Sequence, residues 1–281
     1  MFELFITDLD GTLLDDDKKI SDKNYQAIEM LREKQIAFSV FTGRNFYSAY
    51  DYLKVLNVEG LVALQNGALI IEMPSRKVIN EIYLNASVAW NIYQLAKDRN
   101  FTIIAYTGYH ETETSQSKDM MVEKNSIDCP SFDHYFQHNH ERITFVDSLD
   151  AYFDKRKEIG QLAIIGNEMD LCDLLEQVSF QYSNEISHVL SPIGDDCSFL
   201  EFFGPKVSKG DALTHLLERY HTTAQKTVFI GDNFNDLPLL KKVGLSIAPE
   251  NASKEIKEHC KMIVASNNHH AVGEAIQRIF F

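Results

Sequence analysis

Cysteine is scarce in this chain and is not arranged for metal binding. The sequence has four cysteines among 281 residues, at Cys129, Cys172, Cys197 and Cys260, and no two of them are spaced as C-x-x-C. This scatter does not fit a disulfide framework or a zinc site, so we expect four reduced thiols, as in cytosolic proteins. The chain also lacks an apolar run of bilayer length and a basic, apolar leader at its N-terminus. These absences predict a soluble, cytoplasmic protein.

Positive charge is also in short supply. Lys and Arg together number 27, against 41 Asp and Glu, which gives a formal net charge of -14. The phosphates of nucleic acids and of anionic membranes attract basic surfaces, so we expect neither as a partner. Any phosphate group that binds here must be held by a local pocket rather than by the overall field. The sequence does not indicate an oligomeric state.

Apolar sequence, in contrast, is ample. Hydrophobic residues make up 44% of the 281 positions, enough to bury the core of one large domain or of two modest ones. Near both ends of the chain, strand patterns at residues 4–7, 36–41, 228–230 and 245–248 alternate with helical ones, such as residues 22–34 with Ser21 as N-cap. Repeated strand, turn and helix units predict an α/β fold with a mostly parallel sheet. Ligands bind such sheets beyond the carboxyl ends of the strands.

The middle of the chain has a different pattern. Strand-like segments at residues 101–106, 143–146 and 162–165 are accompanied by a polar stretch, residues 108–141, which we expect to be a loop or an irregular edge. We interpret residues 84–202 as an α+β unit that is inserted into the first domain. The two halves of that first domain would be residues 1–83 and 203–281.

Two carboxylates, Asp8 and Asp10, follow the first predicted strand, and Gly11 comes next. Because side chains alternate along a strand, the two acids would share one face if strand geometry persisted. Like charges at such a distance raise a pKa unless a cation lies between them, so the pair indicates a bound metal, a retained proton, or both. Taken alone, Asp-x-Asp-Gly is more often a strand that ends in a turn. Groups further along the chain favour the chemical interpretation.

Polar groups follow other predicted strands at Thr42-Gly43, Ser208-Lys209-Gly210 and Gly231-Asp232, with Asn235 and Asp236 close behind. Asp8 can attack phosphorus as a carboxylate nucleophile, which splits one hard displacement into two easier ones. Asp10 can protonate the leaving oxygen and then deprotonate the attacking water. The carboxylates of Asp8 and Asp232, with the backbone carbonyl of Asp10, would suit Mg²⁺.

Donors and a cation complete this set of groups. Thr42 and the amide of Gly43 lie at a strand-to-helix turn, where phosphate oxygens are commonly bound. Ser208-Lys209-Gly210-Asp211 resembles a capping box. Lys209 would therefore begin a helix and offset the charge of Asp8 and of a phosphoryl group. Each group alone is more often structural, but all of them together, each after a strand, indicate phosphate chemistry.

The motifs resemble those of the haloacid dehalogenase (HAD) superfamily, specifically its Cof-type phosphatases with a C2-type α/β cap. They are Asp8-Leu9-Asp10-Gly11-Thr12-Leu13, Thr42-Gly43-Arg44, Gln65-Asn66-Gly67-Ala68, Ser208-Lys209-Gly210 and Gly231-Asp232-Asn233-Phe234-Asn235-Asp236. The resemblance spans nearly the whole chain. It implies a Rossmann-like core, an inserted cap that closes over the substrate and sets its identity, and hydrolysis of a phosphate ester through an aspartyl-phosphate.

The resemblance also implies a role for each matched residue. Asp8 would be the nucleophile and Asp10 the acid and base, while Mg²⁺ would bind to Asp8, Asp10 and Asp232. Asp236 would be an auxiliary metal group. Phosphate would be bound by the Leu9 backbone, Thr42, Gly43, Lys209 and Asn235. Members of the family usually hydrolyse small phosphorylated metabolites, such as sugar phosphates, nucleotides or vitamin phosphates.

Two segments depart from the family pattern. Pro249-Glu250-Asn251-Ala252 stands where Met-Gly-Asn-Ala is common, and His269-His270-Ala271-Val272 replaces an acidic residue, glycine and valine. Pro249 fixes its own φ and Glu250 adds a negative charge, so the path of this loop and its effect on substrate choice stay open.

Two other functions are compatible with the same residues. A sugar phosphomutase would return the phosphoryl group to a sugar, and a regulatory protein would bind a phosphate ligand without turnover. A retired site has no chemical reason to keep Asp8, Asp10, Lys209 and Asp232 together. The intact set therefore favours a phosphatase.

Overall fold

The chain folds into two compact units. The computed structural model describes residues 1–99, 101–109, 118–123, 136–137, 139–155, 157–193 and 197–281. One unit consists of Met1–Glu81 and Ser208–Phe281, and the other of Ile82–Val207. The predicted boundaries fell at 83/84 and 202/203, within five residues of these.

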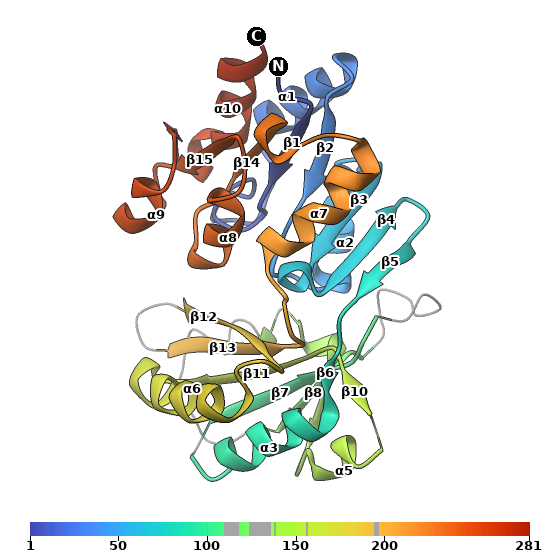
Figure 1. The fold of residues 1–281 in the computed structure, drawn as a ribbon, viewed down its shortest axis with the longest axis vertical. Helices are drawn as coiled ribbons and strands as arrows, with labels where there is room; N and C mark the ends of the chain where they lie inside the picture. The colour runs from blue at the N-terminus through green and yellow to red at the C-terminus, as the bar shows by residue number, and fades with distance from the viewer. Residues whose placement is uncertain (100, 110–117, 124–135, 138, 156, 194–196) are drawn as a thin grey trace. The chain divides into compact units, whose positions relative to one another are not determined.

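The first unit is built on a five-stranded parallel sheet of order β16-β15-β14-β1-β2 (Figure 1). Its strands are β1 (Leu4–Thr7), β2 (Ala37–Val40), β14 (Thr227–Ile230), β15 (Leu245–Pro249) and β16 (Met262–Val264). Helices connect them: α1 (Asp22–Glu33), α2 (Phe46–Val55), α7 (Lys209–Tyr220), α8 (Leu237–Leu240), α9 (Lys254–Glu258) and α10 (Ala271–Phe280). Ser21 caps α1 by accepting from the Asn24 amide. The predicted α/β class is confirmed.

Helices cover both faces of this sheet. Leu4 and Ile6 belong to one buried cluster with residues of α7 and α8. Phe5 points the other way and contacts the ring of Phe280 in α10, with the ring centroids 6.3 Å apart. The alternation of side chains along β1 therefore supplies two apolar layers, which is why all four of its residues are buried.

An antiparallel sheet extends the first unit beyond β2. It consists of β3 (Gly60–Leu64), β4 (Leu69–Met73) and β5 (Lys77–Glu81). An isolated parallel bridge between Phe41 and Ala63 places the end of β3 beside the end of β2. The short 3-10 turn η1 (Gln65–Gly67) links β3 to β4. This arrangement brings η1 to the edge of the parallel sheet where the carboxyl ends of its strands lie.

The second unit contains a six-stranded sheet of order β12-β13-β11-β7-β8-β9 and a small pair, β10-β6. The strands of the large sheet are β7 (Thr102–Tyr106), β8 (Met120–Glu123), β9 (Ile143–Val146), β11 (Gln161–Gly166), β12 (Ser187–Ile193) and β13 (Cys197–Phe203). The pair is β6 (Leu84–Asn85) and β10 (Glu158–Ile159), and the helices are α3 (Ala86–Ala96), α5 (Asp150–Phe153) and α6 (Glu168–Tyr182). Among the described strands of the large sheet, β8 and β9 pair in parallel and the other neighbours pair antiparallel. The predicted α+β character is confirmed.

One segment of the second unit was predicted wrongly. Strand β8 lies inside the stretch of residues 108–141 that we expected to be a loop or an irregular edge, because the polar residues around it mask a four-residue strand. Its Met120 and Val122 are buried in an apolar cluster with Ile104 and Ile165. Residues 110–117 and 124–135 of the same stretch lie outside the described residues.

The expectation of four reduced cysteines is also wrong. Cys197, at the start of β13, is disulfide-bonded. Cys172 and Cys260 are free thiols, and Cys129 lies outside the described residues. Disulfide pairing depends on which residues the fold brings together, and scattered spacing does not exclude it. The spacing of the cysteines is therefore not evidence that the protein works in a reducing compartment.

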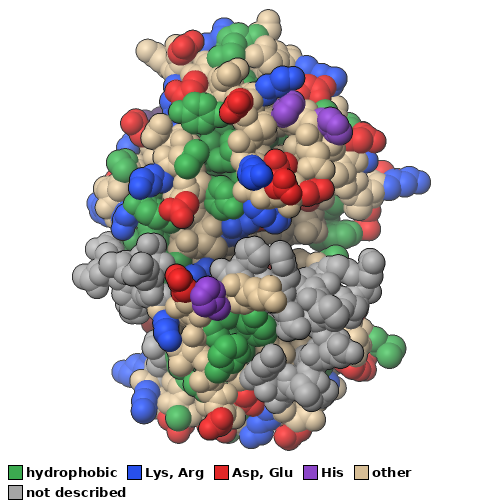
Figure 2. Space-filling model, turned by 180° about the vertical axis from the view of Figure 1, so that it is seen from behind, with side chains coloured by type: hydrophobic (Ala, Val, Ile, Leu, Met, Phe, Trp, Pro, Cys, Tyr) green, Lys and Arg blue, Asp and Glu red, His purple; other side chains and the backbone are tan. Residues whose placement is uncertain are grey.

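Charge is mixed over the surface of the first unit. Figure 2 shows acidic and basic side chains interspersed across the described part of one face. Among the described residues, none of the helices combines the length and the apolar composition that a membrane crossing requires.

Candidate active site

Strand β1 ends one residue before Asp8, and a tight turn follows. The Asp8 amide donates to the Ile230 carbonyl at 3.0 Å, which ties this residue to the end of β14. The carbonyl of Leu9 then accepts from the amides of Thr12, Leu13 and Leu14. Strand alternation stops at this turn, so the condition on which Asp8 and Asp10 were expected to share a face is not met. The two carboxylates have different surroundings.

Asp8 is paired with Lys209. Ser208 caps α7, as the sequence predicted, by accepting from the Asp211 amide. Lys209 is the first residue of α7, and its side chain is fully buried. Its Nζ lies 2.8 Å from Asp8 Oδ1 and 2.6 Å from Asp236 Oδ1. Burial acts to lower the pKa of Lys209, but Asp236 and Asp8 hold that pKa above its ordinary value. The ammonium therefore stays charged between the two acids.

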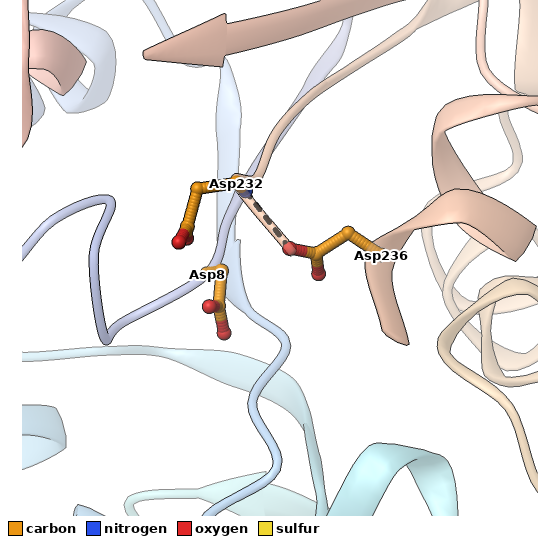
Figure 3. A group of neighbouring side chains, drawn as sticks. All are labelled: Asp8, Asp232 and Asp236. Carbon is orange, nitrogen blue, oxygen red and sulfur yellow. Dashed lines mark hydrogen bonds between the residues drawn. The ribbon is translucent and has the colours of Figure 1, made fainter. Parts of the chain in front are cut away.

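Three carboxylates converge at this point (Figure 3). Asp8, Asp232 and Asp236 each have an oxygen within 4.8 Å of the others. Burial is the largest influence on Asp8, and with Asp236 and Asp232 it raises the pKa well above its ordinary value against the opposing charge of Lys209. Burial, and then Asp236, raise the pKa of Asp232 to about 7. The cluster holds more negative charge than one lysine can balance.

The donor set fits a hard divalent cation. Asp232 Oδ1 accepts from the Thr12 hydroxyl at 2.6 Å, while its other oxygen and Asp8 Oδ2 have no donor among the described residues. Carboxylate oxygens at such spacing are ligands that Mg²⁺ prefers. Asp8 and Asp232, both predicted metal ligands, are therefore the residues that could hold the ion.

Asp236, predicted as an auxiliary metal group, has a different set of contacts. One of its oxygens accepts from Lys209, and the other accepts from the backbone amides of Asp232 and Asn233, at 2.9 and 3.1 Å. Both carboxylate oxygens are engaged, and the residue is fully buried. Asp236 therefore anchors Lys209 and the loop that carries Asp232.

The carboxylate of Asp10, also predicted as a metal ligand, is bound by two cationic side chains outside the three-acid cluster. Arg44 donates to both of its oxygens from Nε and Nη2, and Lys18 Nζ lies 2.8 Å from Oδ1. Partial burial acts to raise the pKa of Asp10, but Arg44 and then Lys18 hold it well below its ordinary value. Its carboxylate is not in the three-acid group that the described residues form. Its backbone carbonyl is the group left for a metal.

Two of the residues predicted to bind phosphate, Thr42 and Asn235, lie beside Gly43. Thr42 is buried, and its Oγ1 accepts from the Arg44 amide at 3.1 Å. A Cβ built on Gly43 would lie 3.7 Å from Asn235 Nδ2, so these two predicted groups are neighbours. The Leu9 amide lies in the turn between Asp8 and Asp10. Lys209, at the start of α7, contacts Asp8.

The two segments that depart from the family pattern contact the Gly11 turn, the N-cap of α1 and β16. Asn251 Nδ2 donates to the Gly11 carbonyl at 2.8 Å, and the Asn267 amide donates to Asn251 Oδ1 at 2.9 Å. His270 Nδ1 lies 2.8 Å from the hydroxyl of Ser21, the N-cap of α1. Pro249 is the last residue of β15, where it pairs with Val264. The contacts of Asn251 and His270 are therefore with the turn and with α1.

No role was predicted for several residues that the structure brings to the site. Thr12 binds Asp232, Arg44 and Lys18 bind Asp10, and Asn66 binds Asn235. Thr12, Arg44 and Asn66 stand inside the quoted motifs, which was the available signal. Lys18 stands in none.

Known proteins resemble this chain along its whole length. A family model described as haloacid dehalogenase-like hydrolase matches residues 5–276. The phosphatase YwpJ of Bacillus subtilis is 23% identical, covering 99% of both chains. The 5-amino-6-(5-phospho-D-ribitylamino)uracil phosphatase YwtE of the same organism is 25% identical, covering 97% of this chain and 96% of its own. The crystal structure of a haloacid dehalogenase-like hydrolase from Bacteroides thetaiotaomicron superposes with a TM-score of 0.82 at 26% identity, and all of both chains is covered.

Proposed function

The chain belongs to the haloacid dehalogenase-like hydrolase family, and on this premise we propose that it is a Mg²⁺-dependent phosphatase of small phosphorylated metabolites. One observation carries the proposal. The buried carboxylate of Asp8 is paired with Lys209 at 2.8 Å and keeps its other oxygen without a donor among the described residues. Relatives that match nearly the whole chain are named phosphatases.

Asp8 is the nucleophile in this proposal. Its oxygen attacks phosphorus, the bond from phosphorus to the ester oxygen breaks, and an aspartyl-phosphate forms. The raised pKa of Asp8 opposes this step, because only the carboxylate is nucleophilic. Lys209 offsets part of the charge on Asp8 and on the transferring phosphoryl group. Bound Mg²⁺ would supply the remaining positive charge and would keep Asp8 and Asp232 ionised.

Asp10 is the acid and base. It protonates the leaving alkoxide in the first half. In the second half it removes a proton from the water that attacks phosphorus, the bond from phosphorus to the Asp8 oxygen breaks, and inorganic phosphate and the free Asp8 carboxylate result. Arg44 and Lys18 hold its carboxylate in place and favour the ionised form. This state suits the second half of the reaction, in which Asp10 must accept a proton.

Phosphate oxygens are bound by groups that surround Asp8. The amides of Leu9 and Gly43, the hydroxyl of Thr42 and the side chain of Asn235 are donors, and Lys209 adds charge. Backbone amides at a turn between a strand and a helix suit an anion, since their N–H groups are fixed before it arrives.

We propose a small metabolite as the substrate and the inserted unit, residues 84–202, as the part that selects it. One relative is named for a phosphorylated ribitylamino-uracil, which is a small molecule. Sugar phosphates, nucleotides and vitamin phosphates are the classes to screen first. Variants in the inserted unit should change the ranking of esters and leave the metal requirement unchanged.

A chromogenic phosphate ester tests the reaction. The parent should release phosphate only when Mg²⁺ is present, and Asp8→Asn should reduce kcat to near background. Asp51→Asn, an exposed acid on α2, is the matched control and should keep parental activity. Equal activity of Asp8→Asn would overturn the assignment of the nucleophile. Sugar isomerisation without phosphate release would identify a phosphomutase, and phosphate binding without either reaction would identify a regulatory protein.

A further inference from the structure

We propose that Asn66 positions the phosphate-binding amide of Asn235, an inference that rests on the proposed function. Asn66 belongs to the Gln65-Asn66-Gly67-Ala68 motif, for which no role has been assigned so far. It lies in η1, at the end of β3, and Asn235 follows β14. Two segments 169 residues apart in the chain therefore meet through these side chains.

The backbone of η1 is hydrogen-bonded to residues 42–44, the loop that we propose binds phosphate. The Gln65 amide donates to the Arg44 carbonyl at 2.9 Å, and the Asn66 amide donates to the Thr42 carbonyl at 3.0 Å. Asn66 has φ 56° and ψ 21°, in the left-handed region. Asn tolerates this region better than most residues. The turn thus holds Asn66 directly beside Thr42 and Gly43.

The side chain of Asn66 links this loop to Asn235. It is 1% exposed, and its Oδ1 accepts a hydrogen bond from Asn235 Nδ2 at 2.8 Å. A Cβ on Gly43 would lie 3.3 Å from the same Oδ1. One N–H of the Asn235 amide is thereby committed to Asn66, which leaves its second N–H to bind a phosphoryl oxygen. Without Asn66, the Asn235 side chain could rotate away.

The pair is not a fully satisfied structural contact. Within the described part of the chain, Asn66 Nδ2 and Asn235 Oδ1 are buried and have no hydrogen-bond partner. A buried polar group without a partner costs stability, so a position that served packing alone would favour an apolar side chain or a fully bonded one. The side-chain amides of Asn66 and Asn235 therefore indicate that a polar ligand binds here. Because Gly43 is their neighbour, we infer that this ligand is the phosphoryl group.

Asn66→Gly is the test variant, because glycine keeps the left-handed backbone and removes only the side chain. The readouts are kcat, KM for a chromogenic ester and Ki for inorganic phosphate, which has no leaving group and reports on the phosphate site alone. We expect KM and Ki to rise together by about tenfold to a hundredfold, as for one lost hydrogen bond to a charged ligand. Both are concentrations that do not depend on the folded fraction. Asn57→Gly, at an exposed left-handed asparagine after α2, is the matched control and should change neither.

A double-variant cycle separates positioning from direct contact. If Asn66 acts through Asn235, then Asn66→Gly should add little to the rise in Ki that Asn235→Ala causes alone. The inference would be overturned if the double variant raised Ki by the product of the two single effects. It would also be overturned if Asn66→Gly left Ki unchanged. Calorimetric titration with inorganic phosphate and Mg²⁺ repeats the comparison without turnover. A parent that binds phosphate but hydrolyses no ester would therefore refute the proposed function and still leave the role of Asn66 measurable.

Discussion

The guanidinium of Arg44 binds both carboxylate oxygens of Asp10, with Nε 2.6 Å from Oδ2 and Nη2 2.7 Å from Oδ1. Arg44 is itself held in place, because Nη1 donates to the Ser48 carbonyl at 3.1 Å and the guanidinium lies over the Tyr52 ring. A planar fork that meets a carboxylate in this way fixes both its direction and its charge. The proposed acid and base is therefore oriented by a residue that lies 34 positions away in the sequence.

Replacement of Arg44 by lysine should shift the pH dependence of hydrolysis. An ammonium cannot reproduce the two parallel hydrogen bonds of the planar guanidinium, so the pKa of Asp10 should rise toward its ordinary value. Since the second half of the reaction needs ionised Asp10, the acidic limb of kcat should move to higher pH, and kcat at the optimum should fall about tenfold to a hundredfold. The measurement is kcat against pH at saturating ester and Mg²⁺. Arg219→Lys, at an exposed pair with Glu72, should leave the profile unchanged. An unmoved acidic limb in Arg44→Lys would count against this role.

Lys209→Met should destabilise the protein in a pH-dependent way. The change leaves Asp8 and Asp236 buried without their shared cation, which costs on the order of 3–5 kcal/mol for a broken buried pair. The loss should be smaller at acidic pH, because the carboxyl groups can then be protonated. Urea unfolding without Mg²⁺ at neutral and acidic pH gives both values. Lys242→Met, which breaks an exposed pair with Asp211, should cost less than about 1 kcal/mol. Equal losses for Lys209→Met at the two pH values would contradict this explanation.

Local patterns in the sequence were enough to predict four strands of the parallel sheet in the first unit, but not β16 or the antiparallel strands β3 to β5. β1 and β14 are short, buried and mostly apolar strands that are soon followed by acids, and α1 has both a cap at Ser21 and an apolar stripe. β8 could not be predicted in the same way. It has four residues, its flanks are polar, and it becomes a strand by pairing with β7 and β9 rather than through its own pattern.

The motifs predicted which side chains would gather at the carboxyl ends of the strands, but not how each would point. Lys209 was expected to offset Asp8 and does contact it. Asp10 was expected to share a face with Asp8 only if strand geometry persisted; the turn at Leu9 ends that geometry, and Arg44 binds the Asp10 carboxylate. Contacts such as Asn66 with Asn235 join segments that only the tertiary fold brings together, so the spacing of motifs in one sequence cannot reveal them.

Mg²⁺ should stabilise the protein more at alkaline than at acidic pH. Without metal, the native state retains protons on Asp8 and Asp232 that the unfolded chain releases near pH 4, so their contribution to stability falls as the pH rises toward 7. Mg²⁺ competes with these protons. At about 100 times its dissociation constant, Mg²⁺ should add roughly 2.7 kcal/mol, and more Mg²⁺ should be needed for this effect at about pH 5.5 than at about pH 8.

Thermal unfolding with and without Mg²⁺ at the two pH values measures this coupling. Asp232→Asn should remove most of the Mg²⁺ effect, whereas Asp17→Asn, at an exposed acid, should keep it. A shift in midpoint that is the same at both pH values, or that persists in Asp232→Asn, would show that the ion binds elsewhere.

Gly11→Ala should weaken the metal site although no proposed ligand is replaced. Gly11 has φ 70°, and a Cβ there would meet the carboxylate of Asp232, with Cγ at 2.8 Å. The methyl group should push Asp232 out of the position in which Thr12 binds it at 2.6 Å. Loss of ligand orientation typically costs tenfold to a hundredfold in metal affinity, so the Mg²⁺ concentration for half-maximal activity should rise by about that factor.

Gly60→Ala separates this effect from backbone strain. Gly60 also has a positive φ, of 107°, and a Cβ there would meet the hydroxyl of Tyr220, but it begins β3 at the end of the strand opposite to η1. Both variants should therefore lose stability, since alanine is strained at either position. Only Gly11→Ala should require more Mg²⁺ at fixed ester concentration. An equal rise in both variants would attribute the effect to general destabilisation, and an unchanged requirement in Gly11→Ala would mean that Asp232 does not hold the ion.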